Sequence, residues 1–157
     1  MAAKLNRAIH GKTINDVLNA PAIVEAFANG FKNAVDNDCE YGGLVYETDG
    51  VLSFKGPKKG DKGSFILETY VQDNKPKGAN DNLVAVWHVH PTPDQARTCR
   101  PSDEDVDNAK INTWANVFYF VITGTKQLKG GKAFPDASRF DDVSIPGKEF
   151  KIWYVAP

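Results

Sequence analysis

The chain contains few of the residues on which several classes of protein depend. Its 157 residues include two cysteines, Cys39 and Cys99, and three histidines, His10, His88 and His90. A disulfide-rich scaffold and a zinc module built on several cysteines both need more cysteines than this. If the protein uses histidine chemistry, the choice of residues is therefore small.

Net charge and long apolar runs are also lacking. The 19 lysines and arginines oppose 20 aspartates and glutamates, for a formal net charge of -1, so no excess of positive charge favours nucleic acid or an anionic membrane surface. No apolar run reaches the roughly 20 residues that span a bilayer, and the first residues lack the apolar stretch of a secretory signal. We expect a soluble chain, cytoplasmic as synthesised, that binds neither nucleic acid nor membrane. Secretion without a cleaved signal peptide is the alternative.

What the chain does contain fits a single domain over residues 1–157. Apolar residues make up 41% and charged residues 25%, which is typical of a packed globular core. Helical and strand periods follow one another and predict an α/β (α+β) domain, with a mixed or mainly antiparallel sheet flanked by helices. Its parts are a helical segment at 12–37, a core at 40–123 with the candidate catalytic residues, and C-terminal strands at 124–157.

The local patterns predict individual elements. The helical segment should break at Pro21, which suits a first helical turn, and end before Asp36. Asp49-Gly50 between two apolar runs predicts a hairpin. The remaining predictions are a polar turn at 56–63, a strand with one buried face at 65–71, a loop at 72–82, a central strand at 83–87, an irregular segment at 91–101, a helix at 102–114, a strand at 117–122, an irregular segment at 134–148 and a last strand at 150–154.

His88 and His90 follow the apolar run 83–87. Side chains at positions i and i+2 of a strand share a face, so the two imidazoles should lie side by side. Asp105 falls in the first turn of a helix that Ser102 would cap. Two imidazoles and a carboxylate are the ligands of a catalytic zinc that keeps one position for water. The alternatives are a hydrogen-bonded histidine pair and an ordinary helix start.

A zinc hydrolase also needs a general base for the bound water. Glu40 and Glu47 are the candidates near predicted strands. Glu47 belongs to a turn, where an acidic residue is commonplace. Glu40 lies between the helical segment and the first strand and is followed by Gly42 and Gly43, which allow another backbone or a substrate to approach closely. The residues only mildly favour Glu40.

Glu40, then His88-x-His90-Pro91, then Ser102-x-x-Asp105 together resemble the signature of the JAMM (also MPN+ or JAB) zinc metallopeptidases, whose fold is cytidine-deaminase-like. A looser similarity, carried by residues 40–46, Asp49-Gly50 and Gly56-Pro57 as well as by the histidine motif, is to the JAB-like domain of bacterial polymorphic (Rhs-type) toxins.

The resemblance implies a role for each matching residue. His88, His90 and Asp105 would bind Zn²⁺, Glu40 would carry a proton from the zinc-bound water to the leaving amine, and Ser102 would stabilise the oxyanion. It implies a metallopeptidase or isopeptidase that hydrolyses amide bonds of a protein or peptide substrate. It also implies a bacterial effector or toxin module, with an immunity or carrier protein as partner.

One departure from the signature is the 14 residues between His90 and Asp105, more than the family usually has. We hypothesise that this longer loop shapes access of the substrate.

Other functions stay open. A non-catalytic MPN-type scaffold or binding protein would have the same fold, and a zinc hydrolase of cell-wall peptides or small amides would have the same ligands.

Cys39 and Cys99 are free thiols in a reducing compartment, or a disulfide after export. Cys99 as a nucleophile ranks below the metal interpretation. His10 should be solvated, and Trp87 should belong to the core.

Overall fold

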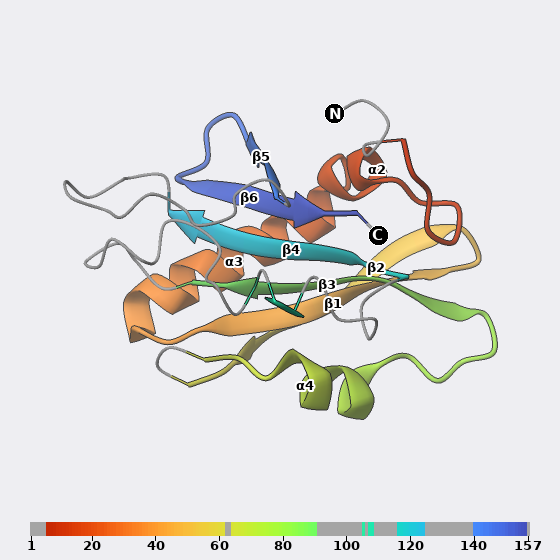
Figure 1. Ribbon diagram of the computed structural model, residues 1–157, viewed down its shortest axis with the longest axis horizontal. Coiled ribbons are helices and arrows are strands. Elements are labelled where there is room, and N and C mark those ends of the chain that lie inside the picture. Colours follow the sequence, from red (N-terminus) through yellow and green to blue (C-terminus); the bar gives the residue numbers. More distant parts are fainter. Residues whose placement is uncertain are drawn as a thin grey trace.

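The computed structural model describes residues 6–61, 64–90, 105, 107–108, 116–124 and 140–156. In these parts, six strands form one sheet in the order β2-β1-β3-β4-β6-β5 (Figure 1). Neighbouring strands are antiparallel except β3 and β4, which are parallel. The elements are α2 (Ile14–Leu18), α3 (Pro21–Asn37), β1 (Tyr41–Thr48), β2 (Val51–Lys59), α4 (Leu67–Asn74), β3 (Asp81–Val89), β4 (Phe118–Gly124), β5 (Asp141–Ser144) and β6 (Phe150–Val155). The α+β class with a mixed sheet is therefore confirmed.

The N-terminal helices follow from local signals. Thr13 begins α2 with a capping box, in which its hydroxyl accepts a 3.1 Å hydrogen bond from Asp16 N and the Asp16 carboxylate accepts a 2.8 Å hydrogen bond from Thr13 N. Pro21 is the first residue of α3, as predicted. The helix continues to Asn37, slightly beyond the predicted end, and stops where Asp38 takes a left-handed conformation with φ 50°.

The hairpin and the central strands are also confirmed. Asp49 and Gly50 connect β1 to β2 with φ values of 51° and 85°, because the favoured two-residue hairpin turn needs left-handed backbone at both positions. The predicted strand at 83–87 is the middle of β3, which lies between β1 and β4. The strands at 117–122 and 150–154 correspond to β4 and β6.

Four local predictions are wrong in whole or in part. Residues 65–71 form no strand, because α4 begins at Leu67. Its buried residues Leu67 and Val71 are four apart, a spacing that suits one face of a helix as well as alternate positions of a strand. The predicted turn at 56–63 is shorter, since β2 continues to Lys59. The loop predicted at 72–82 is also shorter, because α4 extends into its first residues and β3 begins within its last ones. The irregular segment at 134–148 contains β5, a four-residue edge strand paired with β6.

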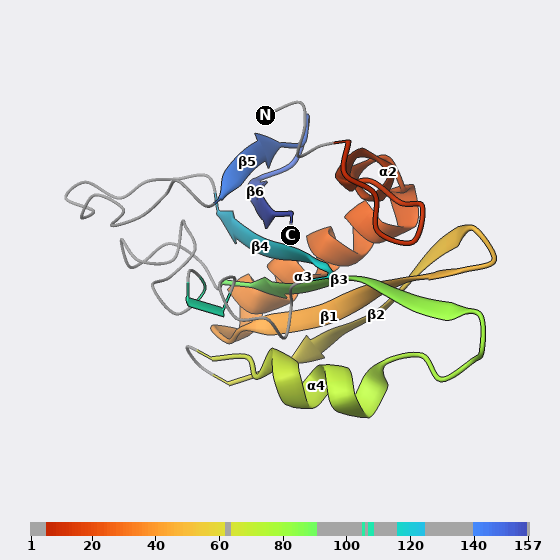
Figure 2. The same ribbon diagram turned by 45° about the vertical axis from the view of Figure 1, so that its right-hand side comes forward.

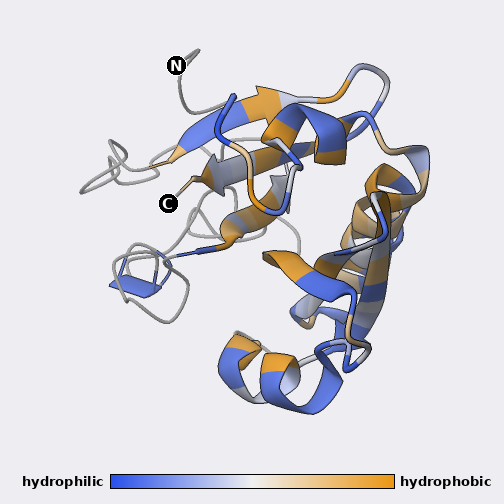
Figure 3. Cartoon of the chain, turned by 90° about the vertical axis from the view of Figure 1, so that its right-hand side faces the viewer, coloured by the Kyte–Doolittle hydropathy of each residue, from blue (hydrophilic) through white to orange (hydrophobic). Residues whose placement is uncertain are grey.

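Each face of the sheet packs against different helices. The face toward α2 and α3 contains Trp87, fully buried as expected, with its ring centroid 5.1 Å from that of Phe27. The opposite face packs Val86 and Tyr119 against Leu67 and Val71 of α4. Figure 3 shows apolar residues on the side of α4 toward the sheet and hydrophilic ones on its outer side. No helix in the described part of the chain is long and apolar enough to cross a membrane.

Candidate metal centre

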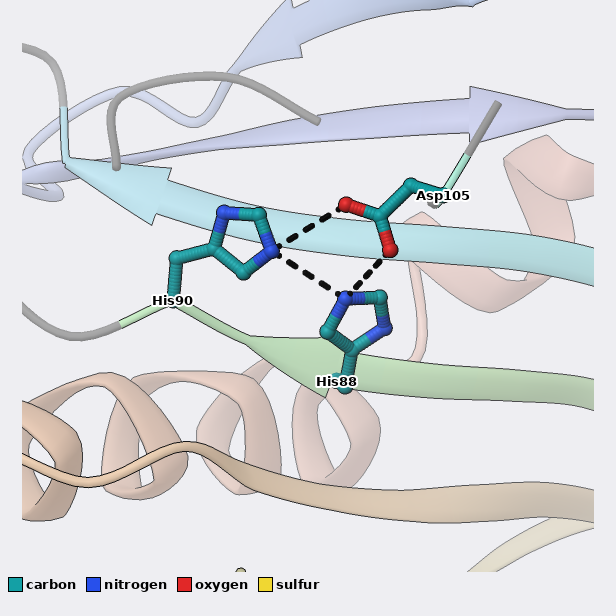
Figure 4. A group of neighbouring side chains, drawn as sticks. All are labelled: His88, His90 and Asp105. Atoms are coloured by element: carbon teal, nitrogen blue, oxygen red, sulfur yellow. Dashed lines mark hydrogen bonds and ion pairs between the residues drawn. The ribbon is translucent and has the colours of Figure 1, made fainter. Parts of the chain in front are cut away.

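Three side chains from two segments meet at the carboxyl end of β3 (Figure 4). His88 is the next-to-last residue of β3, and His90 follows the strand, where its N–H still donates to Ile122 O of β4 at 3.0 Å. Asp105 lies in the short helical piece that Figure 2 shows beside the ends of β3 and β4. His88, His90 and Asp105 are only 4%, 5% and 4% exposed. Such burial is rare for groups of this kind unless they are paired or bind a metal.

The donor atoms of these three residues converge. His88 Nε2 lies 2.8 Å from Asp105 Oδ1, and His90 Nε2 lies 3.1 Å from Asp105 Oδ2. The two Nε2 atoms are 3.2 Å apart. Each residue offers one ligand atom, and all of these lie within 4.8 Å of one another. Two imidazoles and a carboxylate that face a common point could hold a metal ion.

The electrostatics of the cluster also fit a cation. Burial raises the pKa of Asp105, but the charges and hydrogen bonds of His88 and His90 outweigh it and hold that pKa well below its usual range. Asp105 is therefore an ionised carboxylate, whose oxygens can accept hydrogen bonds but cannot donate them. The Nδ1 atom of His88 is buried without a hydrogen-bond partner among the described residues, so the polar contacts of this ring are made by Nε2, the atom that faces the centre.

Glu40 lies at the edge of the cluster. Its Oε1 is 3.9 Å from His90 Nε2, and its side chain is 13% exposed. The main chain of Glu40 is held on the β2 side, because its N–H donates to Asp61 O at 3.0 Å and its carbonyl accepts from Gly60 N at 2.7 Å. The pairing of Tyr41 with Val89 places Glu40 next to His90 on the neighbouring strand. The register of β1 and β3 thus brings this carboxylate to the histidines.

Glu47, the other candidate base, lies at the far end of β1 and is not part of the cluster. Its Oε1 accepts from Gly50 N at 2.7 Å, and its Oε2 accepts from Asn82 Nδ2 at 3.0 Å. Both oxygens hold the hairpin turn and the start of β3 together. Glu47 is therefore a structural residue of the hairpin.

Gly42 and Gly43 permit close approach, as the sequence indicated, but of the protein's own side chains and backbone. Gly42 pairs with His88, and a Cβ on it would lie 2.5 Å from the ring of Phe65. A Cβ on Gly43 would lie 2.2 Å from Lys55 O and 2.7 Å from the Trp87 ring. Gly42 thus lets the Phe65 ring lie over β1 at the position that pairs with His88, and Gly43 makes room for Lys55 and Trp87.

Tyr119 of β4 also touches the cluster, and sequence reasoning missed it. Its hydroxyl donates a 3.1 Å hydrogen bond to Asp105 Oδ1. Burial, and next the charge of Asp105, raise the pKa of Tyr119 well above its usual value. The only signal in the sequence is a tyrosine between Phe118 and Phe120 in a buried strand, where its hydroxyl would need a partner.

Several predicted features lie outside the described residues. They are Ser102, Cys99, the long loop after His90 and most of the predicted helix at 102–114, of which Asp105, Asp107 and Asn108 are helical. Cys39 is a half-buried free thiol, and His10 is exposed as expected.

Comparison of the chain with models of known protein families, with curated proteins and with solved structures gave no match. What supports a function is therefore the mixed sheet and, above all, the buried group of His88, His90 and Asp105 at the end of β3.

Proposed function

We propose that the protein is a zinc-dependent hydrolase of amide bonds, a peptidase or isopeptidase of the JAMM type. The observation that carries the proposal is the buried convergence of two imidazoles and a carboxylate, with a second carboxylate, Glu40, 3.9 Å from His90 Nε2. A structural zinc site usually has four protein ligands, whereas a catalytic one has three and keeps a position for water. The described group has the composition of the catalytic kind.

In the proposed mechanism His88, His90 and Asp105 would hold Zn²⁺. The chemistry that the metal would supply there is a lowered pKa of a water molecule and polarisation of the carbonyl of the scissile amide. Burial of the three residues excludes bulk water and strengthens the electrostatic interactions within the site. Glu40 accepts a proton at its carboxylate and passes it to the nitrogen of the leaving amine. Without this proton the nitrogen would have to depart as an anion, which is a poor leaving group.

The location in the sheet also supports a functional site. β3 and β4 are the parallel pair, and the cluster lies at the carboxyl end of β3. In open, mostly parallel α/β sheets ligands bind beyond the carboxyl ends of the strands, and the single parallel pair of this sheet presents such ends beside the cluster. The other parts of the proposal come from the resemblance to the JAMM signature and to toxin domains. They are the oxyanion role of Ser102, a protein or peptide substrate, and work as a bacterial effector with an immunity or carrier protein.

The test compares the purified wild type with Glu40→Gln and, as a matched control, Glu47→Gln. Metal content is measured by mass spectrometry, and hydrolysis by counting new amino termini in a peptide mixture from a digested bacterial proteome. We expect about one zinc per chain in all three proteins. Hydrolysis should fall about 10²–10⁴-fold in Glu40→Gln, the usual contribution of a general base, and should be unchanged in Glu47→Gln.

Each other result contradicts a defined part of the proposal. A wild type that binds no metal would exclude the enzyme and favour the scaffold alternative. Bound iron in place of zinc would point to oxygen chemistry, because two histidines and a carboxylate also hold non-haem iron. Zinc without release of amino termini would favour a binding protein or a small amide substrate. Toxicity on expression that is equal for wild type and Glu40→Gln would contradict a catalytic effector.

A further inference from the structure

Tyr119 contacts the candidate metal centre from a strand that contributes no ligand. Its side chain is 2% exposed, and its hydroxyl donates a 3.1 Å hydrogen bond to Asp105 Oδ1. The contact joins residues 14 positions apart, from β4 to the helical piece before it. The mechanism proposed above gives this buried hydroxyl no task.

The sheet holds the tyrosine ring in a defined place. In the parallel pair of β3 and β4, Val86 lies opposite Tyr119 and His88 lies opposite Val121. Tyr119 therefore shares a face of the sheet with His88, and their rings meet edge to face with centroids 5.7 Å apart. Phe140 packs against the tyrosine ring at 6.2 Å. Because His88 and Phe140 pack against the tyrosine ring, the ring is held in place and its hydroxyl stays directed at Asp105.

Asp105 is the ligand that most needs such support. Both histidines belong to β3 or its direct continuation, where backbone hydrogen bonds orient them, whereas Asp105 comes from a separate segment. Its contacts at 2.8 and 3.1 Å with His88 and His90 would be replaced when a metal takes those ring nitrogens. The hydrogen bond from Tyr119 comes from neither histidine and can persist with the metal bound.

We propose that Tyr119 is a positioning residue of the metal centre, which holds the Asp105 carboxylate against the two imidazoles. The inference rests on the proposed metal binding by His88, His90 and Asp105. Partners of this kind orient metal ligands in many proteins, and their loss typically weakens metal binding or activity 10- to 100-fold.

The test removes the hydroxyl and keeps the ring. The affinity of the full chain for Zn²⁺ is measured by competition with a chelator for the wild type and for Tyr119→Phe. We expect about 10- to 100-fold weaker binding for Tyr119→Phe. The matched control is Tyr154→Phe, which removes another hydroxyl from a tyrosine buried in the same sheet, 3% exposed, but in the core on the side of α3. Its zinc affinity should equal that of the wild type.

A spectroscopic measurement separates positioning from a merely structural role. The visible absorption of bound Co²⁺ depends on the arrangement of the ligands, so Tyr119→Phe should change this spectrum and Tyr154→Phe should not. A structural role would lower the free energy of unfolding of the metal-free protein without changing the affinity or the spectrum.

The outcomes are distinct. Wild-type affinity and an unchanged spectrum in Tyr119→Phe would overturn the inference and leave the proposed function standing. A wild type that binds neither Zn²⁺ nor Co²⁺ would overturn the proposed function, and the inference with it. If Tyr119→Phe fails to fold, the structure of the zinc-bound wild type decides, and loss of the contact between the Tyr119 hydroxyl and Asp105 in it would overturn the inference.

Discussion

The two ends of the paired strands β1 and β3 both hold buried acidic groups, but the groups are used differently. At the hairpin end Glu47 is 8% exposed, and its two oxygens accept from Gly50 N and Asn82 Nδ2 at 2.7 and 3.0 Å. At the other end Glu40 and Asp105 face His88 and His90. The first acid is satisfied by neutral donors of the turn and the neighbouring strand. The second end gathers titratable groups around one point.

This difference shows how a structural acid can be told from a functional one. A buried carboxylate with neutral hydrogen-bond donors costs little and stabilises the local fold. Groups that all offer lone pairs to one point repel one another unless protons or a cation lie between them. Convergence, and not burial or charge alone, is therefore the feature that marks the carboxyl end of β3 as the candidate site.

The largest expected difference between the two ends is in metal binding. His90→Ala removes a ligand atom and should weaken zinc binding more than 100-fold, the upper range for loss of a supporting residue. Asn82→Ala removes the partner of Glu47 at the hairpin end and should leave zinc binding unchanged. Competition with a chelator measures both. Equal losses in the two variants would mean that the ends are coupled and that the proposed site is not local.

The second difference concerns the glycines near the two ends of β1. A Cβ on Gly43 would lie 2.2 Å from Lys55 O, a backbone atom that cannot move freely, and 2.7 Å from the buried Trp87 ring. Gly43→Ala should lower the free energy of unfolding by about 1–3 kcal/mol or more, as overpacking does. A Cβ on Gly50 would meet no described atom within 4 Å, but the residue has a φ of 85°. Gly50→Ala should therefore cost about 1 kcal/mol through backbone strain.

Denaturant unfolding followed by tryptophan fluorescence measures both glycine variants. A Gly43→Ala protein as stable as the wild type would show that β1 and β2 can separate at this position without cost. It would then contradict the close approach of β1 to Lys55 and Trp87 at Gly43.

The smallest effect is a pH dependence at the hairpin end. The N–H of Gly50, and next the amide of Asn82, lower the pKa of Glu47 from its ordinary value of 4.5. A carboxyl group whose pKa is lower in the folded protein adds stability above its unfolded pKa, and this contribution is lost as the pH falls through the folded pKa. The wild type should therefore be more stable than Glu47→Gln at neutral pH, and the difference should shrink as the pH falls below 4.5.

Thermal unfolding of the metal-free proteins at several pH values measures this difference. If the difference in stability between the wild type and Glu47→Gln stayed constant down to acidic pH, Glu47 would stabilise the hairpin without its charge, for example through the shape of its side chain alone.

Much of the fold could be predicted, because its signals are local. The hairpin, α3 and the buried strands each follow from a turn pair, a helical period or an apolar run within a few residues. The prediction was wrong at α4, where Leu67 and Val71 fit two periods equally well and packing against β1 and β3 decided for the helix. β5 has only four residues, none of them buried, and its pairing with β6 makes it a strand.

For the candidate site, the sequence by itself determined that His88 and His90 share a face, since the two-residue period of a strand is a local property. Only the tertiary structure decided which acids join them. The register that pairs Tyr41 with Val89 brings Glu40 to His90 and takes Glu47 to Asn82, and the β3–β4 pair brings Tyr119 under Asp105. These contacts depend on strand order and register across long stretches of chain, and no short pattern of residues encodes them.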